Sequence, residues 1–447
     1  MSLTRRTVLG GLAAASYSRI LGANDRVQVG FVGYGLIGAQ HVHDFSNQRD
    51  VDMAAMSDTY QPRLEQGVQA CGGKARAYKD FRKLLDDKDL QAVVISTPDH
   101  WHCLMAMMAC AAGKDVYVEK PLSVFVKEGR WLQQVAAKHK RIVQVGTQQR
   151  SGKHYGQARE LIRKDHIGKV LTARSGSFRN ILPGFGSPSD STAPADFDYD
   201  MWLGPAPKRP FNPHRGIYHF RWFWDYSGGQ MTNLGAHQID IVQWFMGLKG
   251  PVKVSSFGGR NAINDNGETP DTQDAIIEYP GGMTMAYSIR EASAGSRAGS
   301  ELEFFGTKGS MQIGRGGMTV IADMKSNPNN LIPQFQGHTA GGPQKVDVKP
   351  EPLTQAMKVP GSSNEQFDLH VRNFLDCIKS RQKTIADVED GHRTATTCHL
   401  ANMSLRLGRM IRWDPETETI AGDKEASAML ERPYRKPWDS VLKGLLG

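Results

Sequence analysis

The sequence predicts an α/β protein with two domains. The first is a doubly wound parallel sheet, and the second is an α+β domain with an open, mainly antiparallel or mixed sheet. The chain has 447 residues, more than one hydrophobic core usually covers. Apolar runs of strand length alternate with helix-like segments over residues 25–147, which is typical of βαβ units. From residue 148 onward, shorter strand-like runs are separated by turn residues.

The strands of the first domain are apolar segments that end at turn residues. Residues 91–97 form a continuous apolar run, as buried parallel strands do. Residues 101–112 are rich in Met and Ala, and Gly113 behind them is a typical helix C-terminus, so a helix is expected there. We expect strands over residues 27–33, 51–58, 91–97, 116–118 and 142–145.

The second domain is expected to cover residues 148–410. A Pro-Gly-Gly turn at 280–282 indicates a hairpin between two of its strands. Residues 314–364 are rich in Gly, Pro, Asn and Gln and are expected to form a long loop region. Residues 411–447 are expected to be a C-terminal tail. We expect strands over 170–178, 252–257, 274–279, 283–289 and 301–305, and amphipathic helices over 367–378 and 389–410.

Composition excludes several classes of protein. Apolar residues make up 39% and charged residues 23%, which is ordinary for a globular chain. The net charge is +9, but no basic run is interleaved with aromatic residues, so nucleic acid is not an expected partner. The five cysteines are odd in number and none lies in a C-x-x-C pair, which predicts neither a disulfide framework nor a zinc site.

The N-terminus resembles an export signal. Arg5 and Arg6 form a twin-arginine pair, an apolar stretch follows over residues 8–15, and small residues lie near Ala23. We interpret residues 1–24 as a twin-arginine signal that sends the protein to the periplasm or another extracytoplasmic space. A frayed amphipathic N-terminus is the alternative. No other window approaches the roughly 18 apolar residues of a membrane span, so no stable membrane anchor is expected.

A glycine-rich turn follows the first predicted strand. Gly33, Gly35 and Gly38 fit the pattern G-x-G-x-x-G between a strand and a helix, which is the dinucleotide-binding fingerprint of a Rossmann domain. The first glycine permits the tight turn, the second lets backbone approach a pyrophosphate, and the third lets helix and strand pack closely. The helix that begins with Leu36 and Ile37 offers free N–H groups to the phosphates.

Asp58 ends the second predicted strand, 20 residues after the third glycine. A carboxylate there can accept hydrogen bonds from an adenosine ribose and would repel a 2′-phosphate, which favours NAD over NADP. A glycine turn used only for packing is the alternative, and S-adenosylmethionine or flavin are further candidate ligands.

Several further motifs carry a family resemblance. They are Glu119-Lys120-Pro121, the segment 228–240 with Asn233 and His237, the segment 97–102, and Trp202-Leu203-Gly204-Pro205. Together with the glycine turn they resemble the Gfo/Idh/MocA oxidoreductases over residues 26 to about 410. The resemblance implies a two-domain fold, nicotinamide redox chemistry and a carbohydrate-like substrate. It adds further cofactor-site residues to the glycine turn and Asp58: Thr97, Pro98, His102, Glu119 and Lys120.

Lys120, His237 and Asn233 are the catalytic residues that the resemblance implies. An ammonium group beside a substrate hydroxyl lowers the pKa of that hydroxyl, and a neutral imidazole can accept its proton while hydride leaves the same carbon. Asn233 stands where the family commonly has Asp, so it keeps hydrogen bonding but adds no charge to stabilise an imidazolium. The alternative for His237 is a helix histidine satisfied by Asp240, three residues on.

Other polar and aromatic residues are candidates for substrate contacts. Gln148, Gln149 and Arg150 follow the last strand of the first domain and are expected to reach substrate hydroxyls; an interdomain hinge is the alternative. Trp222 and Tyr226 are expected to stack on a sugar ring, with a core or dimer contact as the alternative. No metal is predicted, because His100 and His102 are two residues apart at a helix start and face different directions.

Three functional hypotheses follow. The first is an NAD-dependent oxidoreductase acting on a sugar, glycoside or polyol hydroxyl, with tightly bound, recycled NAD, because an extracytoplasmic space supplies little free cofactor. The second is an NAD-dependent glycoside hydrolase that works by transient oxidation and elimination, as some relatives do. The third is a non-catalytic sugar- or nucleotide-binding protein, against which the presence of both Lys120 and His237 argues. The resemblance also implies a homo-oligomer, since the open sheet of this family often packs into dimers or tetramers.

Overall fold

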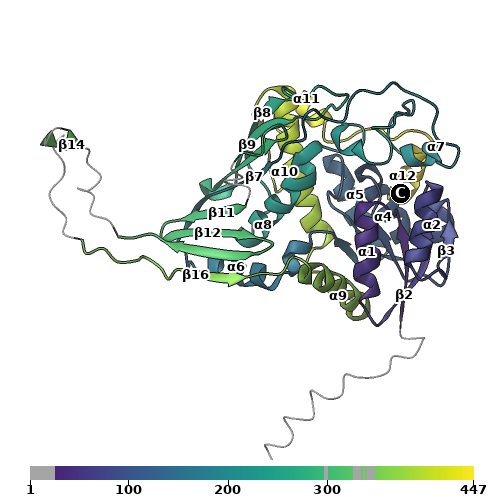
Figure 1. The fold of residues 1–447 in the computed structure, drawn as a ribbon, viewed down its shortest axis with the longest axis horizontal. Helices are drawn as coiled ribbons and strands as arrows, with labels where there is room; N and C mark the ends of the chain where they lie inside the picture. Colours follow the sequence, from purple (N-terminus) through teal and green to yellow (C-terminus); the bar gives the residue numbers. More distant parts are fainter. Residues whose placement is uncertain (1–25, 296–300, 326–333, 336–337, 340–347) are drawn as a thin grey trace, which may run out of the picture.

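The computed structural model describes residues 26–295, 301–325, 334–335, 338–339 and 348–447. The predicted export signal lies outside these residues. The first domain is a six-stranded parallel sheet in the order β3-β2-β1-β4-β5-β6, which confirms the predicted doubly wound fold (Figure 1). Its strands are β1 Val27–Val32, β2 Val51–Ser57, β3 Arg76–Tyr78, β4 Ala92–Ile95, β5 Asp115–Val118 and β6 Val143–Val145.

Helices cover both faces of this sheet. The residues of β4 and β5 are all buried, which explains why these strands appear as continuous apolar runs in the sequence. One apolar core joins β4 and β5 to α4 and α5, and a second core joins β1 and β2 to α1. The helices are α1 Leu36–Ser46, α2 Gln61–Ala70, α3 Phe81–Leu85, α4 His102–Ala111 and α5 Val126–Lys138.

The second domain is built on a nine-stranded sheet in the order β16-β13-β12-β11-β7-β10-β9-β8-β17. It is mixed, as predicted: β10 runs parallel to β7, and the other neighbouring strands are antiparallel. The helices α6 Lys153–Arg163, α8 Ala236–Met246 and α10 Val388–Leu407 share one apolar core with it. Its strands are β7 Val170–Phe178, β8 Lys253–Gly259, β9 Thr272–Glu278, β10 Thr284–Arg290, β11 Leu302–Gly306, β12 Gly309–Gly314, β13 Gly317–Ala322, β16 Met357–Pro360 and β17 Ile411–Arg412.

Two predictions about the C-terminal half are wrong. Residues 314–364 are not simply a loop region, because β13 and β16 extend the sheet at its edge. Residues 411–447 are not a tail: β17 pairs with β8, and Trp438 at the start of α12 (Trp438–Leu446) packs against Trp101 of the first domain. Of these strands, β16 and β17 are short and lie at the two ends of the sheet, where a strand has one paired side and weak periodicity, so the sequence did not indicate them.

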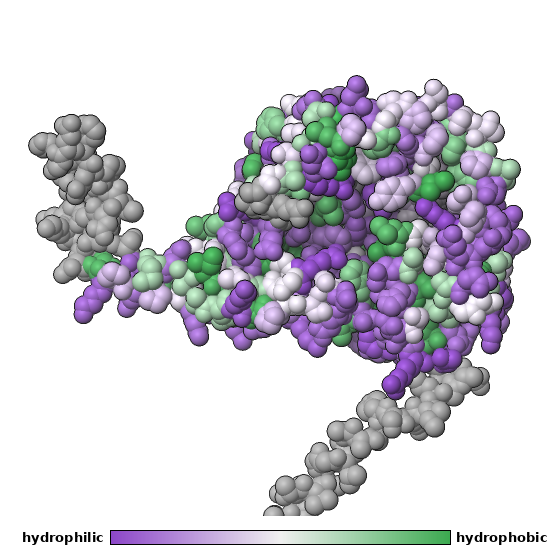
Figure 2. Space-filling view, in the orientation of Figure 1, coloured by the Kyte–Doolittle hydropathy of each residue, from purple (hydrophilic) through white to green (hydrophobic). Residues whose placement is uncertain are grey.

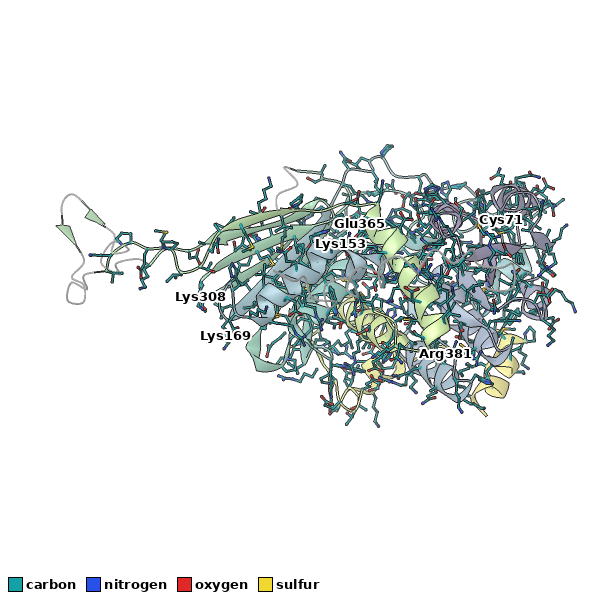
Figure 3. The ribbon with its side chains drawn as sticks, turned by 90° about the horizontal axis from the view of Figure 1, so that it is seen from below. Cys71, Lys153, Lys169, Lys308, Glu365 and Arg381 are labelled. Carbon is teal, nitrogen blue, oxygen red and sulfur yellow. The ribbon has the colours of Figure 1, made fainter. Side chains whose placement is uncertain are left out.

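Helix α9 (Glu365–Ser380) ties the two domains together. Phe374 packs against Phe45 and Tyr117 of the first domain. Figure 3 shows Lys153 beside Glu365 at the start of α9 and Arg381 at its other end; Lys153 pairs with Glu365, and Arg381 pairs with Asp115 at the start of β5. The cofactor domain and the sheet domain are therefore held in one orientation around the space between them.

The outer surface gives little further indication of function. The face of the molecule in Figure 2 is mainly hydrophilic, with separate small apolar patches. In the described part of the chain, no helix is long and apolar enough to span a bilayer.

Candidate active site

A cavity of about 290 Å³ lies between the glycine turn of the first domain and the start of α8 in the second. This volume is near the lower end of small-molecule sites. The ends of β1, β2, β4 and β5 supply one wall, and the segment before α8, the β12–β13 turn and the start of α9 supply the other. The carboxyl ends of parallel strands thus open on one crevice, which is where open α/β sheets bind ligands.

The three glycines of the turn are explained by what a side chain would meet. Gly33 has φ +92°, and a Cβ there would lie 2.8 Å from the carbonyl oxygen of Ser96. A Cβ on Gly38 would lie 2.1 Å from the carbonyl oxygen of Gly33, so only glycine lets α1 approach the turn. A Cβ on Gly35 would meet nothing closer than Arg63, at 3.7 Å, so this backbone is open toward the cavity.

The N-terminus of α1 is free to bind phosphate. Its N-cap residue is Gly35, which has no side chain to cap the helix, and the first turn carries no acidic residue. Leu36 is 75% exposed, and both Leu36 and Ile37 line the cavity. Uncapped N–H groups with an open glycine backbone form the cradle that a pyrophosphate needs, so these residues fit NAD. Gly38 supports the turn from behind and does not itself line the cavity.

Asp58 lies beside this cradle at the end of β2. Its carboxylate accepts hydrogen bonds from the backbone N–H of Tyr34 at 2.8 Å and of Tyr60 at 2.9 Å. Burial raises its pKa and outweighs these two hydrogen bonds, which lower it. Each carboxylate oxygen keeps a lone pair for a ribose hydroxyl. Arg63 and Lys79 also line this end of the cavity.

Thr97, Pro98 and His102, which are predicted to bind the cofactor, follow β4 and line the cavity. The ring nitrogens of His102 lie 2.6 Å from the carbonyl oxygen of Pro121 and 2.9 Å from that of Thr97. The histidine thus links the loop after β4 to the Lys120–Pro121 peptide, which is cis. His100 faces elsewhere, with Nε2 2.9 Å from the carbonyl oxygen of Trp202.

Lys120 reaches across the cavity to the second domain. Its Nζ donates to the backbone oxygen of Asn233 at 3.0 Å and to the Oδ1 of the same residue at 3.1 Å. Asn233 lies in a π-helical turn, Met231–Gly235, directly before α8; such turns are frequent at functional sites. Burial lowers the pKa of Lys120, which the nearby carboxylates of Glu119 and Asp99 oppose.

Glu119 anchors the segment that carries Lys120. Its carboxylate accepts from the backbone N–H of Lys120 at 3.0 Å and from Nε2 of Gln148 at 2.8 Å. It also lies 2.8 Å from Nε2 of His41 in α1. Burial raises the pKa of Glu119, but the hydrogen bond and charge of His41 outweigh burial, so the net pKa is lowered. Glu119 lines the cavity while its carboxylate is held in this buried network.

His237 lies in the first turn of α8 and lines the same cavity. It is buried, and its Nδ1 has no hydrogen-bond partner among the described residues. Burial holds its pKa well below the usual range, and the charges of Lys120 and Arg315 lower it further, so the imidazole is neutral. Asp240 does not satisfy it, because its carboxylate binds Arg150 at 2.8 Å. The alternative of a structural histidine held by Asp240 is therefore wrong.

Four predicted substrate contacts do not line this cavity. Gln149 donates to the hydroxyl of Tyr155 at 2.8 Å, and Arg150 is buried between Asp240 and Asp390. Trp222 donates to Glu291 at 2.7 Å, and Tyr226 is fully buried against His100 and Trp202. All four are buried outside this cavity, so the prediction that they bind substrate is corrected.

Two residues of the same short segments do line the cavity, namely Gln148 and Arg221. Gln148 precedes Gln149 and Arg221 precedes Trp222 in short 3₁₀ turns, where successive side chains point in different directions. Arg315 and Phe367 also line the cavity. Arg315 belongs to the segment expected to be a loop, and nothing in its local sequence indicated a site.

Comparisons with known proteins agree with this geometry. Residues 27–147 match the GFO_IDH_MocA model, an oxidoreductase family with an NAD-binding Rossmann fold. Residues 178–280 and 353–440 match the model of that family's C-terminal alpha/beta domain. Together the two models cover more than half of the chain.

The similar curated proteins include inositol dehydrogenases. Inositol 2-dehydrogenase of Salmonella typhimurium is 29% identical over 182 residues, which are 40% of this chain and 54% of that protein. The chain thus spans about half the length of this relative in the match. The scyllo-inositol 2-dehydrogenase (NAD(+)) of Bacillus subtilis is 26% identical over 87% of this chain and 97% of its own. A glycosyl hydrolase family 109 protein of Shewanella is 35% identical over 23% of this chain and 24% of its own.

A solved structure of scyllo-inositol dehydrogenase from Lactobacillus casei with bound NAD(H) and scyllo-inositol has the same fold. It aligns with a TM-score of 0.61 and 19% identity over 87% of this chain and 99% of its own. The two domain models, the relatives and the cavity point to one classification. The chain belongs to the Gfo/Idh/MocA family of oxidoreductases, with an NAD-binding Rossmann domain and the C-terminal domain of that family.

Proposed function

We propose that the protein is an NAD-dependent oxidoreductase that oxidises a hydroxyl group of a sugar, glycoside or polyol. One observation carries the proposal: Lys120 from the first domain and His237 from the second line one cavity beside the glycine turn, and Lys120 bonds Asn233, four residues before His237. Neither a packing turn nor a simple binding site needs an ammonium group and an unpartnered neutral imidazole together.

Each side chain has a role that follows from its surroundings. The ammonium group of Lys120 donates to the substrate oxygen and stabilises negative charge there as the proton leaves. The neutral imidazole of His237 accepts that proton. Asn233 holds Lys120 in place without cancelling its charge. Bound NAD supplies the hydride acceptor. His237 is buried and Lys120 is partly buried at this point of the cavity.

The direct test uses the purified full-length protein with added NAD and a panel of inositols, hexoses, hexitols, uronates and aldonates. We expect NADH absorbance to rise with at least one of them, and a substrate deuterated at the reacting carbon to deliver its deuterium to the cofactor. Lys120→Ala and His237→Asn should both abolish this transfer. A panel that yields neither NADH nor deuterium transfer, from a protein that binds NAD, would argue for the non-catalytic binder.

Tight retention of NAD is a further part of the proposal. It rests on the twin-arginine pattern at Arg5 and Arg6, which indicates export to a space with little free cofactor. Mass spectrometry of small molecules released from the denatured, freshly purified protein should detect NAD at close to one per chain. Fractionation of cells that express the full chain should place it outside the cytoplasm, and replacement of the two arginines by lysine should retain it inside.

The second candidate function is redox-neutral cleavage of a glycoside. The glycosyl hydrolase family 109 relative favours it, and the same two side chains serve it. Oxidation of a ring hydroxyl acidifies the neighbouring C–H, so the aglycone can leave by elimination; water addition and return of the hydride then complete the cycle. This enzyme would release nitrophenol from a nitrophenyl glycoside without net NADH formation, whereas a simple dehydrogenase would accumulate NADH and release no nitrophenol.

We also propose that the chain forms a homo-oligomer through the outer face of the nine-stranded sheet. Three apolar side chains in the β7-β10-β9-β8 part of that sheet are each at least half exposed: Leu171 in β7, Ile276 in β9 and Phe257 in β8. Exposed apolar groups on a sheet face favour burial against a partner. Light scattering should give a mass that is a multiple of 49.4 kDa, and Phe257→Lys should reduce it.

A further inference from the structure

Arg315 occupies an unusual place in the candidate active site. It lies in the two-residue turn between β12 and β13, and its side chain lines the cavity. Its guanidinium carbon lies 5.3 Å from the ring centroid of Phe367 in α9. The β12–β13 hairpin is anchored to α6, since Nε2 of His154 lies 2.9 Å from the carbonyl oxygen of Gly314. The cation is thus held over the cavity by a short, fixed turn.

The guanidinium of Arg315 has no carboxylate or hydrogen-bond partner among the residues that the structure describes. Burial lowers its pKa, which means that the surroundings disfavour the charge, although an arginine stays protonated. A partly buried cation that stacks on one aromatic ring keeps most of its N–H donors free. Such an arrangement is costly without an anion and favourable with one.

A second arginine of the cavity, Arg221, also stacks on aromatic rings and lacks a carboxylate partner among the described residues. Arg221 lines the cavity from the segment before α8 and stacks on Phe220 and Tyr218, at 4.6 and 5.7 Å. Its guanidinium donates to the carbonyl oxygen of Tyr218 at 3.3 Å, and it forms no ion pair with a described residue. Arg150, by contrast, is buried outside this cavity and is fully paired with two carboxylates.

The charge of this end of the cavity is not balanced. Lys120 meets the neutral oxygens of Asn233, and both arginines lie near enough to lower its pKa. The carboxylates that line this end are those of Asp99 and Glu119, and each is already engaged. Asp99 accepts from the hydroxyl of Ser227 at 2.5 Å, and Glu119 is held by His41 and Gln148. Three cations therefore face two carboxylates, and one positive charge remains for a ligand.

We propose that the natural substrate is a sugar or polyol derivative that carries a carboxylate, such as a uronate or an aldonate. Its carboxylate is bound by the free N–H groups of Arg315, with Arg221 as the second cation, while its reacting hydroxyl lies at Lys120. A guanidinium binds the planar carboxylate through two parallel hydrogen bonds. A monoanion matches the single excess charge better than a phosphate dianion does. The placement of a reacting hydroxyl at Lys120 rests on the proposed redox function. The binding of a carboxylate by Arg315 does not.

The test is isothermal titration calorimetry of the full-length protein saturated with NAD, using matched pairs of ligands. The pairs are glucuronate and glucose, galacturonate and galactose, and gluconate and glucitol, with glucose 6-phosphate as a separate arm. We expect the acid of at least one pair to bind about tenfold or more tighter than its neutral partner, as a charged hydrogen bond gives. The difference should shrink in high salt.

Substitution of Arg315 locates the preference. Arg315→Met should reduce it to about twofold or less, with neutral ligands little affected, and Arg315→Lys should restore part of it. Arg159→Met is the matched control. Arg159 does not line this cavity, and its guanidinium carbon lies 4.9 Å from the ring centroid of Trp244. This variant should keep the full preference for acids.

Three results would overturn the proposal. In the first, no acid in the panel binds better than its neutral partner, or none binds at all. In the second, glucose 6-phosphate binds tighter than every carboxylate. In the third, Arg315→Met leaves the acid preference intact but weakens NAD, which would assign this arginine to the dinucleotide. A protein that prefers acids but transfers no hydride would refute the proposed function and leave this binding site standing.

Discussion

The two ends of the cavity are built in different ways. The dinucleotide end comes mainly from one continuous stretch, residues 32–38, in which backbone geometry and missing side chains form the cradle. The reactive end joins Lys120, Asn233, His237 and Arg315, which lie on separate segments up to 195 residues apart and act through their side chains. The first end depends on local conformation, whereas the second depends on how the two domains pack. Each can therefore be broken without the other.

The largest expected effect is at the reactive end. Lys120→Ala removes the donor to the substrate oxygen and should lower kcat/KM by about 10³-fold, within the range for a general acid–base group. NAD affinity should change little, because the phosphate cradle is intact. Steady-state kinetics and NAD titration measure the two quantities. Lys249→Ala, at the surface pair with Glu416, is the control and should keep normal turnover.

Gly38→Ala tests the dinucleotide end alone. The new Cβ would lie 2.1 Å from the carbonyl oxygen of Gly33 and push α1 away from the turn. A displacement of this size should weaken NAD by about 100-fold and destabilise the fold by about 1–3 kcal/mol. Titration of NAD and denaturant unfolding measure both. Gly156→Ala in α6 is the matched control, since a Cβ there meets nothing within 4 Å. Normal NAD affinity in Gly38→Ala would contradict the role given to this glycine.

The pH dependence of kcat/KM should report the buried charges of the reactive end. Activity needs a neutral His237 and a protonated Lys120. The pKa of His237 is held well below 6.5, so the imidazole stays neutral in mildly acidic solution. The acid limb of the pH profile should therefore lie below pH 6.5. The pKa of Lys120 is also lowered, so the alkaline limb should lie below 10.5. An acid limb at or above pH 6.5 would contradict the site geometry.

Asn233→Asp should have the smallest effect, and it tests whether Asn233 sets the pKa values of Lys120 and His237. A carboxylate at the position of Oδ1, 3.1 Å from Nζ of Lys120, favours the charged forms of both Lys120 and His237. Both limbs of the pH profile should therefore move upward by about one unit, with a few-fold change at the optimum. Asn373→Asp, where the side chain accepts from the backbone of Ile385, adds a charge elsewhere and should leave the profile unchanged. Unmoved limbs in Asn233→Asp would show that Asn233 does not set these pKa values.

The difference between the two ends of the cavity also explains which site residues could be predicted from the sequence. The glycine turn, Asp58 and the strand positions of the first domain could be inferred because each has a local pattern in the sequence. Lys120 and His237 were found through a family resemblance, and the structure brings them to one cavity. Gln149, Arg150, Trp222 and Tyr226 were assigned to substrate wrongly, since in a short turn one side chain faces the cavity while the next packs into the core.

The segment 314–364 shows the limit most clearly. Its composition indicates a loop, but β13 pairs with β12 and β16 closes the edge of the sheet. Arg315 lies in the turn that this pairing creates. The position of this turn is set by the pairing of β12 with β11 and of β13 with β16, so the position of Arg315 over the cavity has no local signature.

The amino-acid sequence by itself determined the class of fold and the dinucleotide cradle, because turn geometry and strand burial are decided by neighbouring residues. The tertiary structure decided which charges meet at the reactive end. Lys120, His237 and Arg315 act together only because α9 and the segment before α8 hold the two domains in one orientation. Electrostatic effects depend on distances through space, and a sequence records only distances along the chain.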